Sequence, residues 1–268
     1  MLTPICPVCG AKLNTEAAPW RCENGHAFDR ARQGYVNLLL ANQKHALHPG
    51  DTRDQVAARK RFLDQGFYAP IRDKVIALLQ PALPQQPAIL DAGCGEGYYG
   101  AAVAEQLQAE LWGVDISKDA VRYAAVRCKR AHWITASAAH LPFANGSFDA
   151  VMSMFALTMD EEFARILKPG GLFLQVLAGE DHLLGLKKVI YPELLRREKH
   201  HPVPVGFEPV TREVLEFDFT LTDNQQVQDL LSMTPHYWRI TKEGAQAAAQ
   251  TETLQDTAQV LFNLYRKQ

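Results

Sequence analysis

The stretch AILDAGCGEGYYG, residues 88–100, joins a short apolar run to four closely spaced glycines. The apolar run Ala88–Ala92 predicts a buried strand, and the residues after the glycines predict a helix over about 98–108. Glycines let the backbone approach a ligand closely, and the first amides of the helix then point towards it. The stretch therefore predicts a ligand site where the first strand of an α/β sheet ends.

The spacing of this loop separates it from the usual dinucleotide-binding loop. Its G-x-G-x-G pattern is formed by Gly93, Gly95 and Gly97. A dinucleotide-binding loop has its third glycine one position later, where this chain has Tyr98. Asp91 precedes the loop, and Asp115 ends the next apolar run about 20 residues beyond Gly95, where an acid can hold ribose hydroxyls.

Outward from the loop, apolar strands alternate with helices. Further strands are predicted at LWGVD (111–115), HWITA (132–136), FDAVMSMFA (148–156) and LFLQVLA (172–178). Helices are predicted at 117–128, capped by Ser117, and at 159–168, ended by Pro169-Gly170-Gly171. Runs at 215–222 and 259–267 predict a closing antiparallel pair around a helix at 223–232. The pattern predicts an α/β protein with a parallel, doubly wound sheet.

The N-terminus carries a metal-binding pattern, Cys-x2-Cys followed after twelve residues by Cys-x3-His. Its predicted ligands are Cys6, Cys9, Cys22 and His26. Thiolates and imidazole in two short pairs suit tetrahedral zinc, and four protein ligands make the site structural. A module this small needs the metal to fold. The alternatives are free thiols or a redox-active Cys-x2-Cys. Cys94 and Cys128 lie outside the pattern.

Composition bounds the class of protein. The chain has 268 residues, of which 47% are hydrophobic and 22% charged, as in globular proteins. It shows no apolar run long enough to span a membrane and no secretion signal, so we expect no membrane partner. The odd count of five cysteines argues against a disulfide framework and favours a cytoplasmic location. A mildly basic front and an acidic remainder are compatible with an anionic partner.

Three parts are predicted along the chain. Residues 1–34 form the zinc-binding module, residues 35–86 a helical connector that contributes to the ligand site, and residues 87–268 the α/β domain that carries the glycine loop.

The α/β part resembles the S-adenosylmethionine-dependent methyltransferases of the Rossmann-like class. The resemblance rests on LDAGCGEGYYG, SAAHLPFANGSFDAV and LKPGG, in this order. It implies that Asp91 lies near the methionine part, that the glycines pass beneath it and that Asp115 holds the ribose. Ser137 and Ala138 would flank the adenine. The alternative is a glycine turn in a nucleotide-free or NAD-binding sheet.

The whole chain resembles the 23S ribosomal RNA guanine-N1 methyltransferases. The resemblance rests on the Cys3His pattern, GYVNLL, PGD, ARKRFLDQGFYAPIRD, the glycine loop and LLSMTPHYWR. It implies methyl transfer from S-adenosylmethionine to N1 of a guanine in a 23S rRNA hairpin, a structural Zn²⁺, and compatibility with a homodimer. The family has two branches that act on neighbouring guanines, and the target nucleotide and branch stay open.

Further contacts to the cofactor are implied by this resemblance. Tyr68 would close the pocket from the N-terminal side, the loop residues Glu96, Gly97 and Tyr98 would line it, and His182 would approach it after the fifth strand. For Tyr68 the alternative is helix packing, and for His182 it is a surface cap. The catalytic base stays unassigned.

One loop departs from the family pattern. Where the family has tyrosine-alanine-proline after the fourth strand, this chain has MFALTMDEE, residues 154–162. The loop normally faces the acceptor base, so its change bears on target choice. Aromatic residues that could stack on the base are Phe155, Tyr237 and Trp238, and core packing is the alternative for each. If the zinc module grips the RNA backbone, phosphate contacts are predicted at Arg21, Arg30, Arg32 and Lys44; the alternative role of the module is a dimer contact or a lid support.

Two rival functions remain at this level. One is a small-molecule methyltransferase, because MFALTMDEE also resembles the acceptor loops of such enzymes. The other is a non-catalytic zinc adaptor that binds S-adenosylmethionine as a sensor.

Overall fold

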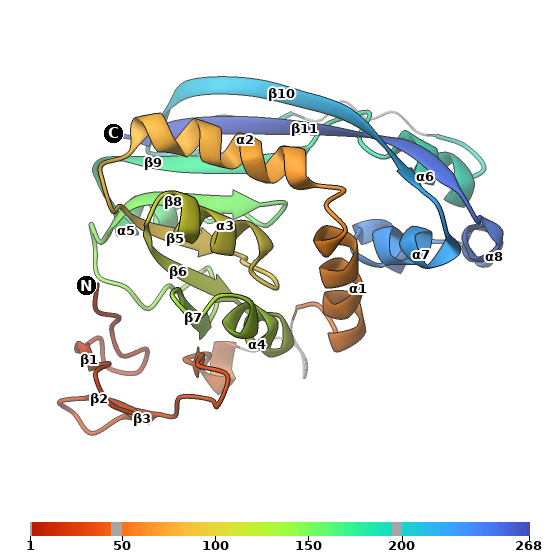
Figure 1. The fold of residues 1–268 in the computed structure, drawn as a ribbon. Coiled ribbons are helices and arrows are strands. Elements are labelled where there is room, and N and C mark those ends of the chain that lie inside the picture. The colour runs from red at the N-terminus through yellow and green to blue at the C-terminus, as the bar shows by residue number, and fades with distance from the viewer. Residues whose placement is uncertain (1, 44–49, 195–199) are drawn as a thin grey trace.

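The computed structural model describes residues 2–43, 50–194 and 200–268. An eight-stranded mixed sheet with strand order β10-β11-β9-β8-β5-β6-β7-β4 forms its centre (Figure 1). The strands are β4 (Val36–Asn37), β5 (Ala88–Ala92), β6 (Glu110–Asp115), β7 (His132–Thr135), β8 (Phe148–Met154), β9 (Leu167–Ala178), β10 (Phe207–Leu221) and β11 (Leu254–Lys267).

Strands β4 to β9 run parallel to one another, and β11 runs antiparallel to both β9 and β10. The predicted α/β class, its parallel strands and the closing antiparallel pair are therefore confirmed. The central strands are continuous apolar runs because both faces of the sheet are covered, and in β5 the last four residues are buried.

Helices surround the sheet. They are α1 (Arg53–Asp64), α2 (Ala69–Leu79), α3 (Tyr98–Gln106), α4 (Lys118–Arg127), α5 (Asp160–Ile166), α6 (Leu184–Ile190), α7 (Asn224–Ser232) and α8 (Lys242–Gln250), with 3-10 turns η1 (Ala41–Gln43), η2 (Gln80–Ala82) and η3 (Pro235–Trp238). Figure 1 shows α1 and α7 beyond the ends towards which the arrowheads of β5, β6 and β8 point. Within the described residues, no helix has the length and hydrophobicity that a membrane crossing requires.

Local signals in the sequence explain where the first helices begin. Thr52 and Gln55 form a reciprocal capping box at the start of α1, and the predicted cap Ser117 accepts a hydrogen bond from Ala120 N at 3.3 Å. Helix α1 is fastened to α7 because Arg61 makes two hydrogen bonds to the buried carboxylate of Asp229, at 2.9 and 2.6 Å.

The N-terminal module lies on the face of the sheet opposite α2 and α3. It contains the short strands β1 (Leu13–Asn14), β2 (Trp20–Cys22) and β3 (Ala27–Phe28). The ring of Trp20 lies 6.3 Å from that of Trp112 on β6, and Ile5 N donates to Pro142 O at 2.8 Å. The module and α5 thus share one hydrophobic cluster with the sheet, so the module is docked rather than tethered.

Several details differ from the sequence prediction. Strand β4 lies in the part predicted to be a helical connector and extends the main sheet by pairing with β7. Strand β9 already begins at Leu167, so the Pro-Gly-Gly segment lies within the strand rather than after a helix. Helices α6 and α8 were not predicted, and β10 and β11 begin at Phe207 and Leu254, before the predicted starts at 215 and 259.

Candidate functional site

The candidate site follows the edge of the sheet where the parallel strands end. Ser137 and Ala138 follow β7, Asp115 ends β6, the glycine loop follows β5, Phe155 follows β8, and His182 follows β9. The strand order places them along the edge in that sequence. The chain leaves β5 in one direction towards β6 and reaches β8 on the other side, and ligands of such sheets bind at this switch point.

The glycine loop is shaped by contacts that leave no room for a side chain. Gly93 has φ +80°, and a Cβ there would lie 2.7 Å from the Cβ of Ala156, in the loop after β8. Gly97 has φ +82°, and its Cβ would lie 2.9 Å from Trp133. The loop therefore turns tightly between two strands, and the helix α3 that follows starts with its amides at the sheet edge.

Asp91 is buried near the end of β5, and one of its carboxylate oxygens accepts no hydrogen bond from the described residues. Its side chain is 1% exposed, and its Oδ1 has no hydrogen-bond partner among the described residues. Burial, and then the charges of Asp115 and Glu96, raise the pKa of this carboxyl well above its ordinary value. An orphaned buried acid beside a glycine turn fits a ligand that brings a positive charge or a donor.

Asp115 is held in one orientation by backbone amides. Its Oδ2 accepts from Gly95 N at 2.9 Å, and its Oδ1 accepts from Ser117 N at 2.8 Å. The Ser117 hydroxyl in turn donates to Asp51 O at 2.8 Å, which ties Asp51 to this end of the site. Each carboxylate oxygen can accept a second hydrogen bond, so the pair suits two neighbouring hydroxyls. Burial raises the pKa of the Asp115 carboxyl.

Glu96 and Tyr98 lie among arginines that the sequence pattern did not mark as site residues. Glu96 is 2% exposed, and burial raises its pKa although Arg127 and Arg59 oppose the rise. Arg127 contacts the Glu96 carboxylate at 3.4 Å and also lies over the Tyr98 ring. Arg59 lies in the ARKRF motif, so the sequence could have indicated it as a site residue, whereas nothing in the sequence marks Arg127.

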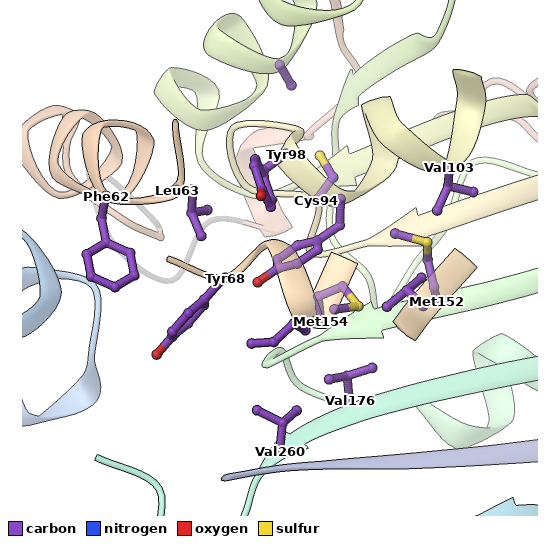
Figure 2. Packing of buried hydrophobic residues seen from close by; sticks show 14 of the residues in the cluster. Phe62, Leu63, Tyr68, Cys94, Tyr98, Val103, Met152, Met154, Val176 and Val260 are labelled. Atoms are coloured by element: carbon purple, nitrogen blue, oxygen red, sulfur yellow. The ribbon is translucent and has the colours of Figure 1, made fainter. Parts of the chain in front are cut away.

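Tyr68 and His182 are brought together from distant parts of the chain. Tyr68 precedes α2, and its hydroxyl lies 3.4 Å from Nε2 of His182. Both side chains are buried, at 3% and 9% exposure. Figure 2 shows the Tyr68 hydroxyl directed away from the hydrophobic cluster in which its ring is packed. Both predicted residues thus meet at the β9 end of the edge, and Ser137 and Ala138, half-buried, lie at the β7 end.

The four predicted metal ligands converge in the N-terminal module. The ligand atoms of Cys6, Cys9, Cys22 and His26 all lie within 4.8 Å of one another. The Cys9–Cys22 sulfur distance is 3.7 Å, and Nδ1 of His26 lies 3.3 Å from Cys22 Sγ. Tetrahedral zinc with Zn–S near 2.3 Å and Zn–N near 2.0 Å separates its ligand atoms by about 3.5–3.8 Å, so the set fits the ion.

The surroundings of Cys9 favour the thiolate that zinc requires. Asn24 Nδ2 donates to Cys9 Sγ at 3.3 Å, and this hydrogen bond is the largest cause that lowers the pKa of the Cys9 thiol to about 6. Cys94 is buried in the glycine loop and Cys128 ends α4, so neither belongs to the cluster, as predicted.

Comparison with known proteins finds relatives for both parts of the chain. Residues 89–171 match the family model of a methyltransferase domain, and residues 5–47 match the RlmA N-terminal zinc ribbon. A 23S rRNA (guanine(748)-N(1))-methyltransferase of Streptomyces fradiae is 37% identical, covering 87% of this chain and 85% of the relative. A relative from Bacillus subtilis, assigned the 23S rRNA (guanine-N(1)-) activity, is 31% identical over 89% of this chain and 88% of its own.

The chain belongs to the 23S rRNA guanine-N1 methyltransferases. It is an enzyme that uses S-adenosylmethionine, and its ribbon carries a structural Zn²⁺. Among solved structures, a chain from Anaeromyxobacter dehalogenans described as a type II methyltransferase aligns with a TM-score of 0.51 at 19% identity, covering 72% of this chain and 95% of that one, which supports the fold alone.

Proposed function

We propose that the protein transfers a methyl group from S-adenosylmethionine to N1 of one guanine in a hairpin of 23S rRNA. The observation that carries the proposal is the docking of a zinc ribbon onto a methyltransferase sheet, in a chain that aligns with the Streptomyces fradiae 23S rRNA enzyme over 87% of its length. The activities of the relatives specify the substrate class, and the edge of the sheet supplies the place for the reaction.

Each part of the sheet edge has a proposed role in holding the cofactor. S-adenosylmethionine supplies an electrophilic methyl group when it is bound. Asp115 holds the ribose, Ser137 and Ala138 flank the adenine, and Asp91 faces the methionine end. The glycine loop, with Gly93, Gly95, Glu96, Gly97 and Tyr98, passes beneath the cofactor. Tyr68 and His182 close the pocket at the β9 end, beside Phe155.

The chain must chiefly align the two reactants. Guanine N1 carries a proton and lies on the Watson–Crick edge, which base pairing hides, so the base has to be unpaired or flipped out. Holding N1 in line with the methyl carbon at near-attack distance supplies most of the rate enhancement. Asp160, one of the acids near the acceptor loop, accepts from Val205 N at 3.3 Å, and the catalytic base stays unassigned.

The zinc ribbon is proposed to grip the RNA backbone. Arg21, Arg30 and Arg32 all lie on the module with side chains that reach solvent. Because the ribbon is packed against Trp112, RNA held by it has a fixed position relative to the sheet. Lys44, the fourth predicted phosphate contact, lies outside the described residues.

Three further proposals complete the functional picture. The chain works as a ribbon (1–34), a connector (35–86) and a methyltransferase domain (87–268), with β4 carrying the connector into the sheet. The enzyme acts in the cytoplasm, where its rRNA substrate would be made. Two copies associate, as the family resemblance implies, which sedimentation of the purified protein would test.

The test uses labelled S-adenosylmethionine and large-subunit rRNA from cells that lack this protein. The RNA is digested to nucleosides after reaction, and the proposal expects label in 1-methylguanosine alone. Label in transfer RNA or in a small extract component, with none in rRNA, would overturn the substrate assignment and favour the small-molecule reading. Cofactor binding without transfer would favour the adaptor reading.

A further inference from the structure

The residue that follows β8 has a strained backbone at the site. Phe155 has φ +54°, in the left-handed region that phenylalanine rarely adopts. Its side chain is 39% exposed, although it directly follows a buried strand. Such strain persists at functional sites where the surroundings impose it. The strained backbone fixes the direction in which the Phe155 side chain leaves the end of β8.

The surroundings of Phe155 are aromatic. Its ring lies 6.4 Å from that of Tyr68 and 6.1 Å from that of His182, and those two rings lie 6.2 Å apart. The two partners are buried, so Phe155 is the member of the triad that reaches the surface. A triad of rings with one exposed member offers a purine a stacking surface.

The loop that carries Phe155 is anchored at both ends. Phe155 N donates to Val176 O at 2.8 Å, and Gln175 Nε2 donates to the Thr158 hydroxyl at 2.9 Å. Asn263 Nδ2 holds the same Gln175 side chain at 3.1 Å. The two anchors therefore enclose a span of only two residues, Ala156 and Leu157.

These two residues face opposite surroundings. Ala156 contacts the cofactor loop, because a Cβ added to Gly93 would lie 2.7 Å from the Ala156 Cβ. Leu157 is 78% exposed, the largest exposure among the large apolar side chains of the described residues. An apolar side chain held out on a short anchored loop resembles the wedges that proteins insert between base steps.

We propose that this loop extracts and holds the acceptor guanine: Leu157 fills the gap that the flipped guanine leaves between its neighbours, and the Phe155 ring stacks on the extracted base. This inference rests on the proposed function. The Ala156 contact sets the distance between the stacked base and the cofactor loop. Phe155 and Leu157 both fall within the segment that departs from the family pattern.

The experiment measures the single-turnover rate of methyl transfer to 23S rRNA with enzyme in excess, together with S-adenosylmethionine affinity. Leu157→Ala is expected to lower the rate roughly tenfold or more, and Phe155→Leu roughly ten- to hundredfold, with cofactor affinity within about twofold of the parent. Leu157→Met and Phe155→Tyr retain an apolar wedge and a stacking ring, so each is expected to keep a rate within about threefold of the parent.

The matched control is Val126→Ala, because Val126 on α4 is also an exposed apolar side chain, at 58%, and should leave the rate unchanged. A rate for Leu157→Ala or Phe155→Leu within about twofold of the parent would overturn that residue's role. Loss of cofactor affinity in step with the rate would also overturn it, because it would indicate a structural role. If the parent enzyme itself transfers no methyl to rRNA, the proposed function fails instead.

Discussion

At the scale of single residues, the proposed cofactor site contains residues whose surroundings are unfavourable in the protein alone. Asp91 is buried with an orphaned oxygen, and Gly93 has a backbone angle and a close contact that other residues do not tolerate. Sites of this kind trade stability for binding. Substitutions at Asp91 and Gly93 should therefore affect the stability of the protein and its function in different ways.

Asp91→Asn should stabilise the ligand-free protein while weakening cofactor binding. Because burial raises the Asp91 pKa above its ordinary 3.8, the folded state binds this proton more tightly than the unfolded state. The free energy of unfolding therefore falls as pH rises from 3.8 through the raised pKa, and asparagine removes that penalty. We expect a higher melting temperature at pH 7 and roughly ten- to hundredfold weaker S-adenosylmethionine binding by calorimetry.

Asp149→Asn is the control for this change. Both carboxylate oxygens of Asp149 accept hydrogen bonds, from Ala88 N at 2.8 Å and from Lys168 Nζ at 2.7 Å. Replacing this carboxylate with the asparagine amide should therefore lower the melting temperature and leave cofactor binding unchanged. A destabilised Asp91→Asn protein that binds the cofactor normally would contradict the role of Asp91.

Gly93→Ala should separate backbone strain from the contact with the acceptor loop. Gly146 has a similar φ of +64° but nothing within 4 Å of an added Cβ, whereas the added Cβ of Gly93→Ala meets Ala156 at 2.7 Å. Backbone strain should destabilise both alanine variants by about 1–2 kcal/mol, measured by urea unfolding, and the close contact with Ala156 should destabilise Gly93→Ala further. Only Gly93→Ala should abolish methyl transfer, and equal activity of the two variants would rule out the contact as a functional feature.

At the scale of elements, short-range patterns were predictable and tertiary pairings were not. The glycine loop and the metal ligands could be predicted because their spacing along the chain carries the chemistry. Strand β4 is two residues long, too short for any periodicity, and exists through its pairing with β7. Helix α8 contains Gly244, and a glycine weakens the helical signal in the sequence. The glycine is required by packing, because an added Cβ there would lie 2.2 Å from Ile190 O.

The same limit applies to the site. Asp91, Asp115 and the glycines follow from local sequence, whereas the approach of Tyr68 to His182, 114 residues later, is set by the fold and was available only through resemblance. The strain at Phe155 has no sequence signature, because it arises from how β8 ends against β9.

The zinc ribbon is the element that should be destabilised most by the loss of a single side chain, because its fold depends on the bound metal. Cys22→Ser should reduce bound zinc from one ion per chain to near zero by elemental analysis, because three ligands hold the ion far less tightly than four. We expect residues 1–34 to become the first site of protease cleavage, since metal binding is folding free energy for this module. Cys128→Ser, outside the cluster, should retain the metal, and full zinc content in Cys22→Ser would disprove the ligand set.

At the scale of the whole molecule, the zinc ribbon is docked on the sheet that carries the candidate site. The ribbon shares its hydrophobic cluster with β5, β6 and α5, so it cannot move independently of the sheet without breaking that cluster. The arginines proposed as phosphate contacts on the ribbon should then affect RNA affinity, while the residues at the sheet edge affect methyl transfer.

Neutralising the ribbon should change the salt dependence of RNA binding. In Arg30→Gln with Arg32→Gln, the slope of log affinity against log salt for the 23S hairpin should fall by about 0.7–0.9 for each phosphate that the protein no longer neutralises. Arg212→Gln with Arg266→Gln, on β10 and β11 at the other edge of the sheet, should leave the slope unchanged. An identical slope in the ribbon variant would remove the proposed grip.

The most direct test of the proposed reaction maps the product on the RNA. A methyl group on guanine N1 blocks Watson–Crick pairing, so reverse transcriptase stops beside it. We predict that 23S rRNA from cells lacking this protein gains a single new stop, within one hairpin, after incubation with the zinc-loaded enzyme and S-adenosylmethionine, and that Gly93→Ala produces none. No new stop in 23S rRNA, or an undiminished stop with Gly93→Ala, would contradict the proposed reaction and its site.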